Sequence, residues 1–155
     1  MIRTTAFRTA IVAFAIGLSG LAKAQDAPTH PVHETNSVSI PAKDIKFFKA
    51  GVKAAAGELE AGPAYGNLQT GHHGTFIHMP AGFISAVHTH TEDYYAVVVK
   101  GVGANDPVGA KPKPLAVGSY WFQRGEEDHV TRCLSKTDCL FFIVQPGKFD
   151  YVAAK

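Results

Sequence analysis

The sequence GFISAVHTHTEDY, residues 82–94, holds two histidines separated by a single residue, His88 and His90. Side chains alternate faces along a β-strand, so both imidazoles point to the same side of such a strand. Two imidazoles on one face can bind the same metal ion, and imidazole suits zinc, copper, iron and nickel. The pair alone is a weak signal, because solvated surface histidines also occur at this spacing.

Short apolar runs lie on both sides of this segment, and glycine or proline separates them. Each run is a few residues long and rich in β-branched or aromatic residues, which predicts an all-β sandwich or barrel. The one helix candidate is the alanine-rich stretch 52–60, which Gly57 and Gly62 limit to two turns. The predicted strands cover residues 45–48, 75–79, 84–87, 94–99, 120–122 and 140–144.

The spacing around the two histidines resembles the first motif of the cupin superfamily. That motif runs Gly, five residues, His-x-His, three residues, Glu, six residues, Gly. In this chain Gly82, His88, His90 and Gly101 match the motif in type and register. The glutamate position instead holds Tyr94. The match therefore covers both histidines and both glycines but lacks the carboxylate.

The second cupin motif runs Gly, five residues, Pro-x-Gly, two residues, His, three residues, Asn. Counting from Gly118 places the motif histidine eleven residues later, at His129. The proline position holds Arg124, the second glycine position holds Glu126, and the asparagine position holds Cys133. The spacing of this motif is kept although three of its residue types are not.

The resemblance extends over roughly residues 40–150 and is greatest to small, exported, single-domain cupins. It implies a double-stranded β-helix, which is a jelly-roll barrel of two antiparallel sheets. It also implies that His88, His90 and His129 converge inside the barrel mouth and bind one divalent metal ion. Fe, Mn, Ni and Zn all accept imidazole ligands, so the identity of the metal stays open.

A cupin usually supplies a glutamate as its fourth metal ligand, and the absence of this residue leaves three alternatives. Tyr94 can enter the site as a phenol, either as a ligand or bonded to a bound water. Glu92 can take over, since it shares the strand parity of the two histidines. A bare three-histidine site would leave the ion its full double charge, which favours an anionic ligand and lowers the pKa of bound water.

Other residues near the motifs are weaker candidates. His72, His73 and His78 precede the first motif, and His78 can hold a ligand or a water if it does not simply face solvent. The acidic run 126–128 can orient His129 or form an exposed loop. Aromatic residues are expected to form the core and the pocket wall, namely Phe83, Tyr95, Trp121, Phe122, Phe141 and Phe142.

The N-terminal residues 1–24 have the pattern of a secretory signal peptide, with Arg3 and Arg8, an apolar run over 10–21 and small residues at 22 and 24. The apolar run is shorter than the roughly 20 residues of a membrane span. Removing this segment takes away three of the 15 basic residues and none of the 13 acidic ones, so the net charge becomes 12 − 13 = −1. No basic patch then remains for binding nucleic acid.

The predicted organisation is a signal peptide at 1–24, a flexible leader at 25–37 and a cupin domain at 38–155, in a periplasmic or secreted protein. Export would place Cys133 and Cys139 in an oxidising compartment, where a disulfide is expected. Two free buried thiols are the alternative. The polar segment between the cysteines predicts a turn that joins two strands.

Two classes of function fit these features. One is an exported metalloenzyme, a dioxygenase, lyase or isomerase acting on a small oxygen-rich molecule, in which Tyr94 is a proton donor or the fourth ligand. The other is a metal or small-ligand binding or sensor protein without turnover. A barrel with vestigial histidines is a third interpretation, and the fold does not separate the three. The expected partner is a small molecule rather than nucleic acid or a membrane, and the chain is a candidate homodimer.

Overall fold

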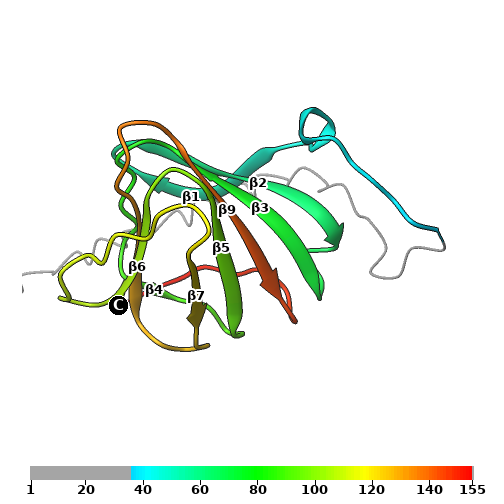
Figure 1. The fold of residues 1–155 in the computed structure, drawn as a ribbon. Coiled ribbons are helices and arrows are strands. Elements are labelled where there is room, and N and C mark those ends of the chain that lie inside the picture. The colour runs from blue at the N-terminus through cyan, green and yellow to red at the C-terminus, as the bar shows by residue number, and fades with distance from the viewer. Residues whose placement is uncertain (1–35, 155) are drawn as a thin grey trace, which may run out of the picture.

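A computed structural model describes residues 36–154 of the chain, which form ten β-strands and one short 3-10 helix, η1 (Ala42–Asp44). The predicted signal peptide and most of the predicted leader lie outside the described residues. Figure 1 shows two facing sheets that together form a barrel. The predicted all-β, jelly-roll architecture is confirmed. No helix in the range 36–154 is long and apolar enough to cross a membrane.

The strands pair antiparallel within two sheets of six and four strands. The larger sheet is ordered β1 (Phe48–Ala54), β2 (Gly57–Gly66), β3 (His73–Met79), β9 (Cys139–Gln145), β5 (Tyr94–Lys100) and β7 (Tyr120–Gln123). The smaller sheet is ordered β10 (Val152–Ala153), β4 (His88–Thr89), β8 (His129–Cys133) and β6 (Gly103–Pro107).

The helix expected at 52–60 is wrong, because β1 and β2 form a hairpin over these residues. Val52 and Leu59 are both buried and line the pocket described below. Alanine favours a helix by only a few tenths of a kcal/mol per residue, roughly, over other ordinary residues. Burial of these two apolar side chains on one sheet face outweighs that preference.

Alternation along the strands places the core between the sheets. In β9 the buried residues are Cys139, Phe141, Ile143 and Gln145, and the residues between them are only partly buried. The expectation that all the listed aromatic residues are core is wrong for Tyr95 and Phe122, which are exposed. Both stand on the outer side of the larger sheet, one residue out of phase with the buried Tyr94 and Trp121.

The motif glycines occupy backbone conformations that other residues rarely adopt. Gly82, Gly101 and Gly118 have φ values of 71°, 83° and 86°. Glu126, at the motif's remaining glycine position, has a φ of 60° and is the one non-glycine residue with positive φ among the described residues. Glu126 thus holds a left-handed conformation that favours glycine, at a cost of roughly 1–2 kcal/mol.

The disulfide between Cys133 and Cys139 is present, with 5.7 Å between the two Cα atoms. Cys133 ends β8 in the smaller sheet and Cys139 begins β9 in the larger one. The intervening segment is therefore not a hairpin turn, as the two adjoining strands belong to different sheets. The bond ties the two sheets together at one end of the barrel.

Candidate metal centre

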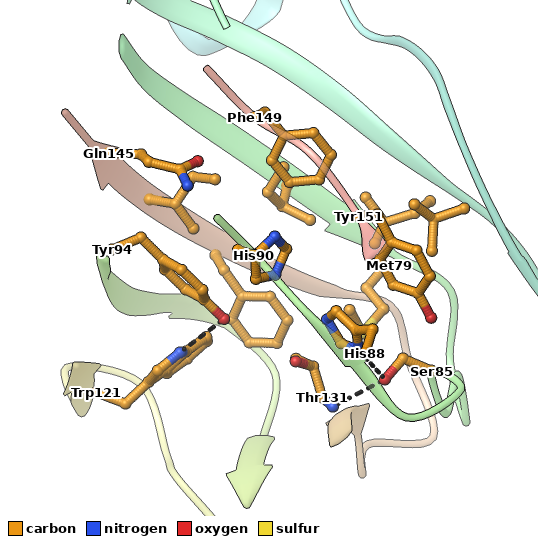
Figure 2. A pocket seen from close by; sticks show the side chains of 15 residues that line it. Met79, Ser85, His88, His90, Tyr94, Trp121, Thr131, Gln145, Phe149 and Tyr151 are labelled. Carbon is orange, nitrogen blue, oxygen red and sulfur yellow. Dashed lines mark hydrogen bonds between the residues drawn. The ribbon is translucent and has the colours of Figure 1, made fainter. Parts of the chain in front are cut away.

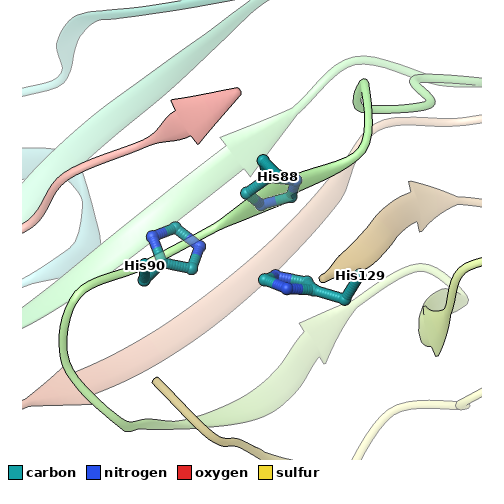
Figure 3. A group of neighbouring side chains, drawn as sticks. All are labelled: His88, His90 and His129. Atoms are coloured by element: carbon teal, nitrogen blue, oxygen red, sulfur yellow. The ribbon is translucent and has the colours of Figure 1, made fainter. Parts of the chain in front are cut away.

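Three histidines meet inside the barrel mouth, on strands of the smaller sheet. His88 on β4 pairs across the sheet with His129 on β8, and His90 follows directly after β4. The three side chains are almost fully buried, and their ring centroids lie 4.1–5.3 Å apart. One nitrogen from each ring falls within 4.8 Å of the others. Figure 3 shows the three rings turned toward a common space.

Backbone carbonyls fix the orientation of all three rings. The Nδ1 atom of His88 lies 3.0 Å from the carbonyl oxygen of Ala86, and that of His129 lies 2.9 Å from the carbonyl oxygen of Glu127. The Nδ1 of His90 is likewise bonded to the carbonyl of Asp150. A carbonyl only accepts hydrogen bonds, so each Nδ1 carries the proton. Each Nε2 is then left with its lone pair, as in a histidine that binds a metal.

All three imidazoles are held neutral at ordinary pH. Burial, together with the neighbouring imidazoles, lowers the pKa of His88 to about 3 and that of His90 to about 4. Burial also lowers the pKa of His129. The buried Nε2 of His129 makes no hydrogen bond to any described residue. Three neutral nitrogen donors, one of them unpaired, fit a divalent transition metal.

Glu92, one of the two candidates for the fourth ligand, does not join the three histidines. Glu92 is exposed, and its side chain lies against Gly147 on the outside of the site. Within residues 36–154 the three histidines are the one group of His, Cys, Asp and Glu arranged to hold a metal ion, and it contains no carboxylate.

Tyr94 lies beside the histidines but is occupied by other hydrogen bonds. Its ring centroid is 5.0 Å from that of His90. The hydroxyl oxygen accepts from the indole N–H of Trp121 at 3.3 Å and donates to the amide oxygen of Asn105 at 3.5 Å. Burial raises the pKa of Tyr94 to about 12. The side chain is therefore a neutral phenol, and its role as ligand or proton donor stays a prediction.

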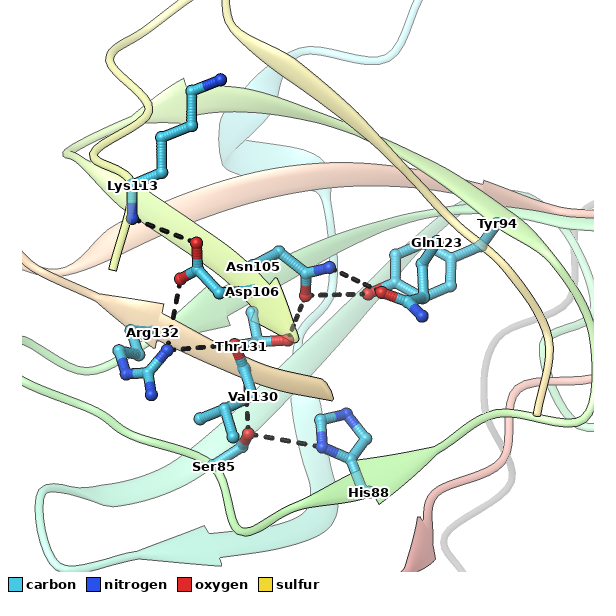
Figure 4. A network of polar contacts seen from close by, with 10 residues as sticks. All are labelled: Ser85, His88, Tyr94, Asn105, Asp106, Lys113, Gln123, Val130, Thr131 and Arg132. Carbon is cyan, nitrogen blue, oxygen red and sulfur yellow. Dashed lines mark hydrogen bonds and ion pairs between the residues drawn. The ribbon is translucent and has the colours of Figure 1, made fainter. Parts of the chain in front are cut away.

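A buried polar network behind the site was not predicted from the sequence (Figure 4). The amide oxygen of Asn105 accepts from the hydroxyl of Thr131 at 2.7 Å, and its amide nitrogen donates to Gln123 at 2.7 Å. Gln123 donates in turn to the carbonyl of Glu127, which also accepts from His129. The network thus links Tyr94 to His129. Gln123 could have been recognised from the sequence, because it is a polar residue two positions after Trp121 and therefore on the same buried face of the strand. Asn105 lies between the two motifs, and no sequence pattern marks it.

The C-terminal segment also completes the site. Residues 149–154, here called the C-terminal strap, cross the barrel mouth, and β10 pairs with β4. The ring of Tyr151 stacks on His88 with 4.2 Å between centroids, and Phe149 lies 5.6 Å from the ring of His90. The carboxylate of Asp150 accepts from the backbone and hydroxyl of Thr91. No sequence motif indicated this contribution.

The three histidines that precede the first motif lie in three different environments, which the sequence did not predict. His78 does not support the site, because it lies on the outer face of β3 between the carboxylates of Glu60 and Asp138. His73 is the buried one, with its Nδ1 2.8 Å from the hydroxyl of Thr75. His72 is exposed. The acidic side chains at 126–128 are exposed too, and it is the backbone carbonyl of Glu127 that orients His129.

A pocket of about 50 Å³ adjoins His88 and His90 (Figure 2). Polar groups in its lining come from Ser85, Thr131, Tyr94, Tyr151 and Gln145. No lysine, arginine, aspartate or glutamate is among the described residues that line it. The rest of the wall is apolar and consists of Val52, Leu59, Ile77, Met79, Trp121, Phe141, Ile143 and Phe149.

Solved structures share this fold at low sequence identity. The polyketide cyclase RemF from Streptomyces resistomycificus matches with a TM-score of 0.63 and 14% identity, over 77% of this chain and 87% of that one. The DMSP lyase DddQ from Ruegeria pomeroyi matches with a TM-score of 0.56 and 15% identity, over 89% and 86%. An RmlC-like cupin from Shewanella frigidimarina matches with a TM-score of 0.53 and 19% identity, over 74% and 93%.

The sequence comparisons give a narrower result. None of the curated proteins matches the chain significantly. A family model described as "Domain of unknown function (DUF4437)" matches residues 44–154, which is well over half of the chain and includes all three histidines. The chain therefore belongs to the DUF4437 family, and it shares the fold of RmlC-like cupins.

Proposed function

We propose that this protein is a metal-dependent enzyme that binds one divalent transition metal through His88, His90 and His129. The observation that carries the proposal is the arrangement of three neutral imidazoles, each with its Nδ1 bonded to a backbone carbonyl and its Nε2 free. The adjoining pocket would bring a small molecule to the same place. A bound divalent ion would act there as a Lewis acid on an oxygen of that molecule.

A lyase or isomerase reaction fits the site better than oxygen activation. The two-histidine, one-carboxylate set of non-haem iron oxygenases is not what the described residues provide, because the cluster holds three histidines and no carboxylate. The names of two structural neighbours, a polyketide cyclase and a DMSP lyase, agree with non-oxidative chemistry on small molecules.

Tyr94 is the proposed hydrogen-bond donor to the reacting molecule. Its pKa of about 12 keeps the phenol protonated, so it can donate a proton or a hydrogen bond but cannot serve as a resting base. Trp121 and Asn105 hold the hydroxyl in place from two sides. Reorienting the hydroxyl from Asn105 toward a ligand would break only the 3.5 Å contact.

The pocket lining favours a different substrate from the oxygen-rich molecule expected from the sequence. Most of the wall is apolar, and the metal would be its one source of positive charge among the described lining residues. A cavity of about 50 Å³ holds a few water molecules. We therefore propose a compact, largely apolar substrate with one oxygen group that faces the metal.

Metal analysis tests the ligand set. The protein purified without chelator is expected to contain about one transition-metal ion per chain by elemental analysis, and His88→Ala is expected to lose it. His72→Ala is the matched control, since His72 is exposed and lies outside the cluster. A full complement of metal in His88→Ala, or none in the wild type after incubation with zinc, iron, manganese or nickel, would contradict the proposal. Stoichiometric metal without any turnover would favour the binding or sensor function.

Export to the periplasm or the cell exterior also belongs to the proposal. The disulfide between Cys133 and Cys139 supports it, because such bonds persist in oxidising compartments. The signal peptide at 1–24 lies outside the described residues and stays a prediction.

We propose a homodimer formed through the outer face of β5 and β7. Tyr95 and Val97 on β5 and Tyr120 and Phe122 on β7 are apolar and exposed, with Tyr120 at 70%. Exposed apolar side chains that adjoin in this way are typical of protein–protein interfaces. A second copy is the simplest partner, since two-fold symmetry matches one patch with itself. β7 is also the edge strand of the larger sheet.

Sedimentation equilibrium tests this interface. The wild type is expected to be dimeric, and Tyr120→Lys is expected to be monomeric because it places a charge in the patch. Val108→Lys, at an exposed position just after β6, is the control and should stay dimeric. A monomeric wild type, or a dimer that Tyr120→Lys leaves intact, would exclude this interface.

A further inference from the structure

A short loop between β7 and β8 contacts two of the three histidines. Residues 124–127, here called the ligand loop, end two residues before His129. The backbone carbonyl of Glu127 in this loop accepts from the Nδ1 of His129 at 2.9 Å and so fixes the ring. The backbone N–H of Glu126 donates to the carbonyl of His90 at 2.7 Å. Any movement of the ligand loop would therefore move the ring of one histidine and the backbone of another.

The residues of the ligand loop do little to hold its conformation. Glu126 has a φ of 60°, which is unfavourable for a residue other than glycine. The side chains of Arg124, Glu126 and Glu127 are exposed, so their burial does not stabilise the loop. At the surface, the carboxylate of Asp93 accepts from the backbone N–H of Gly125 at 2.7 Å. The remaining support comes from the interior of the barrel.

Gln123 supplies this support from the end of β7. Its side chain is buried, and only 5% of the residue is exposed. The amide nitrogen donates to the carbonyl of Arg124 at 3.0 Å and to that of Glu127 at 3.3 Å, which are the two ends of the ligand loop. Both protons of the amide are thus used on this loop. The Glu127 carbonyl that accepts one of them is the same atom that accepts from the ring of His129.

Asn105 fixes the direction of the Gln123 amide. The amide nitrogen of Asn105 donates to the amide oxygen of Gln123 at 2.7 Å. If the Gln123 amide were turned over, its oxygen would face two carbonyl oxygens, which cannot donate to it. The amide oxygen of Asn105 accepts from the hydroxyls of Thr131 and Tyr94, and Figure 4 shows Asn105 between Tyr94 and Gln123. A continuous chain of hydrogen bonds therefore runs from the phenol to the ring of His129.

We propose that Gln123 is a positioning residue, which holds the ligand loop so that the Nε2 of His129 faces the metal. It does not bind the metal itself and acts through the carbonyl of Glu127. Losing the partner of a metal-binding histidine typically weakens metal binding by about 10–100-fold, and Gln123 supports such a partner. The inference rests on the proposed metal site, and it adds the residue that ties this site to the proposed hydrogen-bond donor, Tyr94.

Gln123→Met tests this role, because methionine has a similar size and shape but cannot donate to either carbonyl. In competition with a coloured chelator, the variant is expected to bind zinc about tenfold more weakly than the wild type does. The visible spectrum of the cobalt-loaded protein, which reports on ligand geometry, is expected to change as well. Gln69→Met, at an exposed position, is the matched control. Asp106→Asn, which weakens a buried ion pair with Arg132 instead, should also leave both measurements unaltered.

A second variant guards against misfolding of Gln123→Met. Asn105→Asp keeps the acceptor for Thr131 and Tyr94 but cannot donate to Gln123, so it frees the amide and should change the cobalt spectrum too. The inference is overturned by unchanged zinc affinity in a folded Gln123→Met, or by weaker affinity with the wild-type cobalt spectrum. If Gln123→Met does not fold, an unchanged spectrum in Asn105→Asp overturns it. These outcomes leave the proposed metal site standing, whereas a wild type that takes up no zinc contradicts that site itself.

Discussion

Lowering the pH from 6.5 to 4 is expected to destabilise the metal-free protein by several kcal/mol. Burial lowers the pKa values of His73, His88 and His90 from 6.5 to about 4, about 3 and about 4. The folded protein keeps these rings neutral over this range, whereas the unfolded chain takes up a proton on each. Each of these histidines therefore lowers the free energy of unfolding by up to about 1.4 kcal/mol for each unit by which the pH falls.

The direction follows from which state binds more protons. Because each folded pKa lies below the unfolded value, the unfolded state is the more protonated one between pH 4 and 6.5, and stability rises with pH throughout that window. Above about pH 6.5 these rings are neutral in both states and their contribution no longer changes. A small domain has about 5–15 kcal/mol of stability in total, so three such groups are enough to unfold the metal-free protein in mild acid.

Urea titrations at several pH values between 4 and 7.5, after treatment with EDTA, measure the effect. His73→Gln removes one of the three groups without touching the metal cluster, so its stability should fall less steeply with acid than that of the wild type. His72→Ala, which changes an exposed ring, should leave the slope unaltered. A urea midpoint that stays constant between pH 6.5 and 4 would show that the buried rings are not neutral.

The sequence was sufficient to predict the barrel and the convergence of the three histidines. His88 and His90 are fixed by strand alternation, which is local, and the eleven-residue spacing from Gly118 located His129. The turn glycines explain why that spacing carries information. Gly82, Gly101 and Gly118 all have positive φ, so each marks a point where the chain must turn.

The errors arose where local preference competed with burial. The alanine-rich stretch 52–60 has good helix formers, but its apolar residues Val52 and Leu59 are required on the inner face of a sheet. Likewise, apolar character did not show that Tyr95 and Phe122 point outward, since a face exposed in one chain can still be apolar. Only the register of β5 against β7 and β9 reveals which residues face the core.

The polar surroundings of the site could not be predicted from the sequence, for a different reason. Asn105, Gln123 and Gln145 act through contacts with residues far away in the chain, and none of them belongs to a motif. The C-terminal strap is the extreme case, because Asp150 contacts His90 across 60 residues. Such contacts depend on how the sheets close, which residue spacing does not encode.

Ending the chain after Lys148 is expected to weaken zinc binding by at least about tenfold, which is the usual effect of removing the partner of a metal-binding histidine. The truncation removes the backbone carbonyl of Asp150, which holds the proton on the Nδ1 of His90. It also removes the Tyr151 ring that stacks on His88. The ring of His90 would then be free to rotate, and ordering it would oppose metal binding, whereas the carbonyl of Ala86 would still hold the ring of His88.

Competition for zinc against a coloured chelator measures the affinity, and a thermal melt of each metal-free variant reports on folding. Asp150→Ala is the matched control, because it removes the carboxylate that binds Thr91 but keeps the carbonyl that binds His90. It should retain more zinc affinity than the truncated chain. Tyr151→Leu removes the ring that stacks on His88 and keeps the backbone of β10, so it measures the contribution of that ring alone.

The pattern among these variants identifies which atom of the strap acts on the metal site. A large loss confined to the truncated chain points to the Asp150 carbonyl and the Phe149 ring, since both contact His90 and both point variants keep them. A loss in Asp150→Ala as large as in the truncation would assign the effect to the carboxylate and Thr91. Unchanged affinity in a folded truncated chain would mean that His90 needs no carbonyl partner, and the strap would then serve only to cover the pocket.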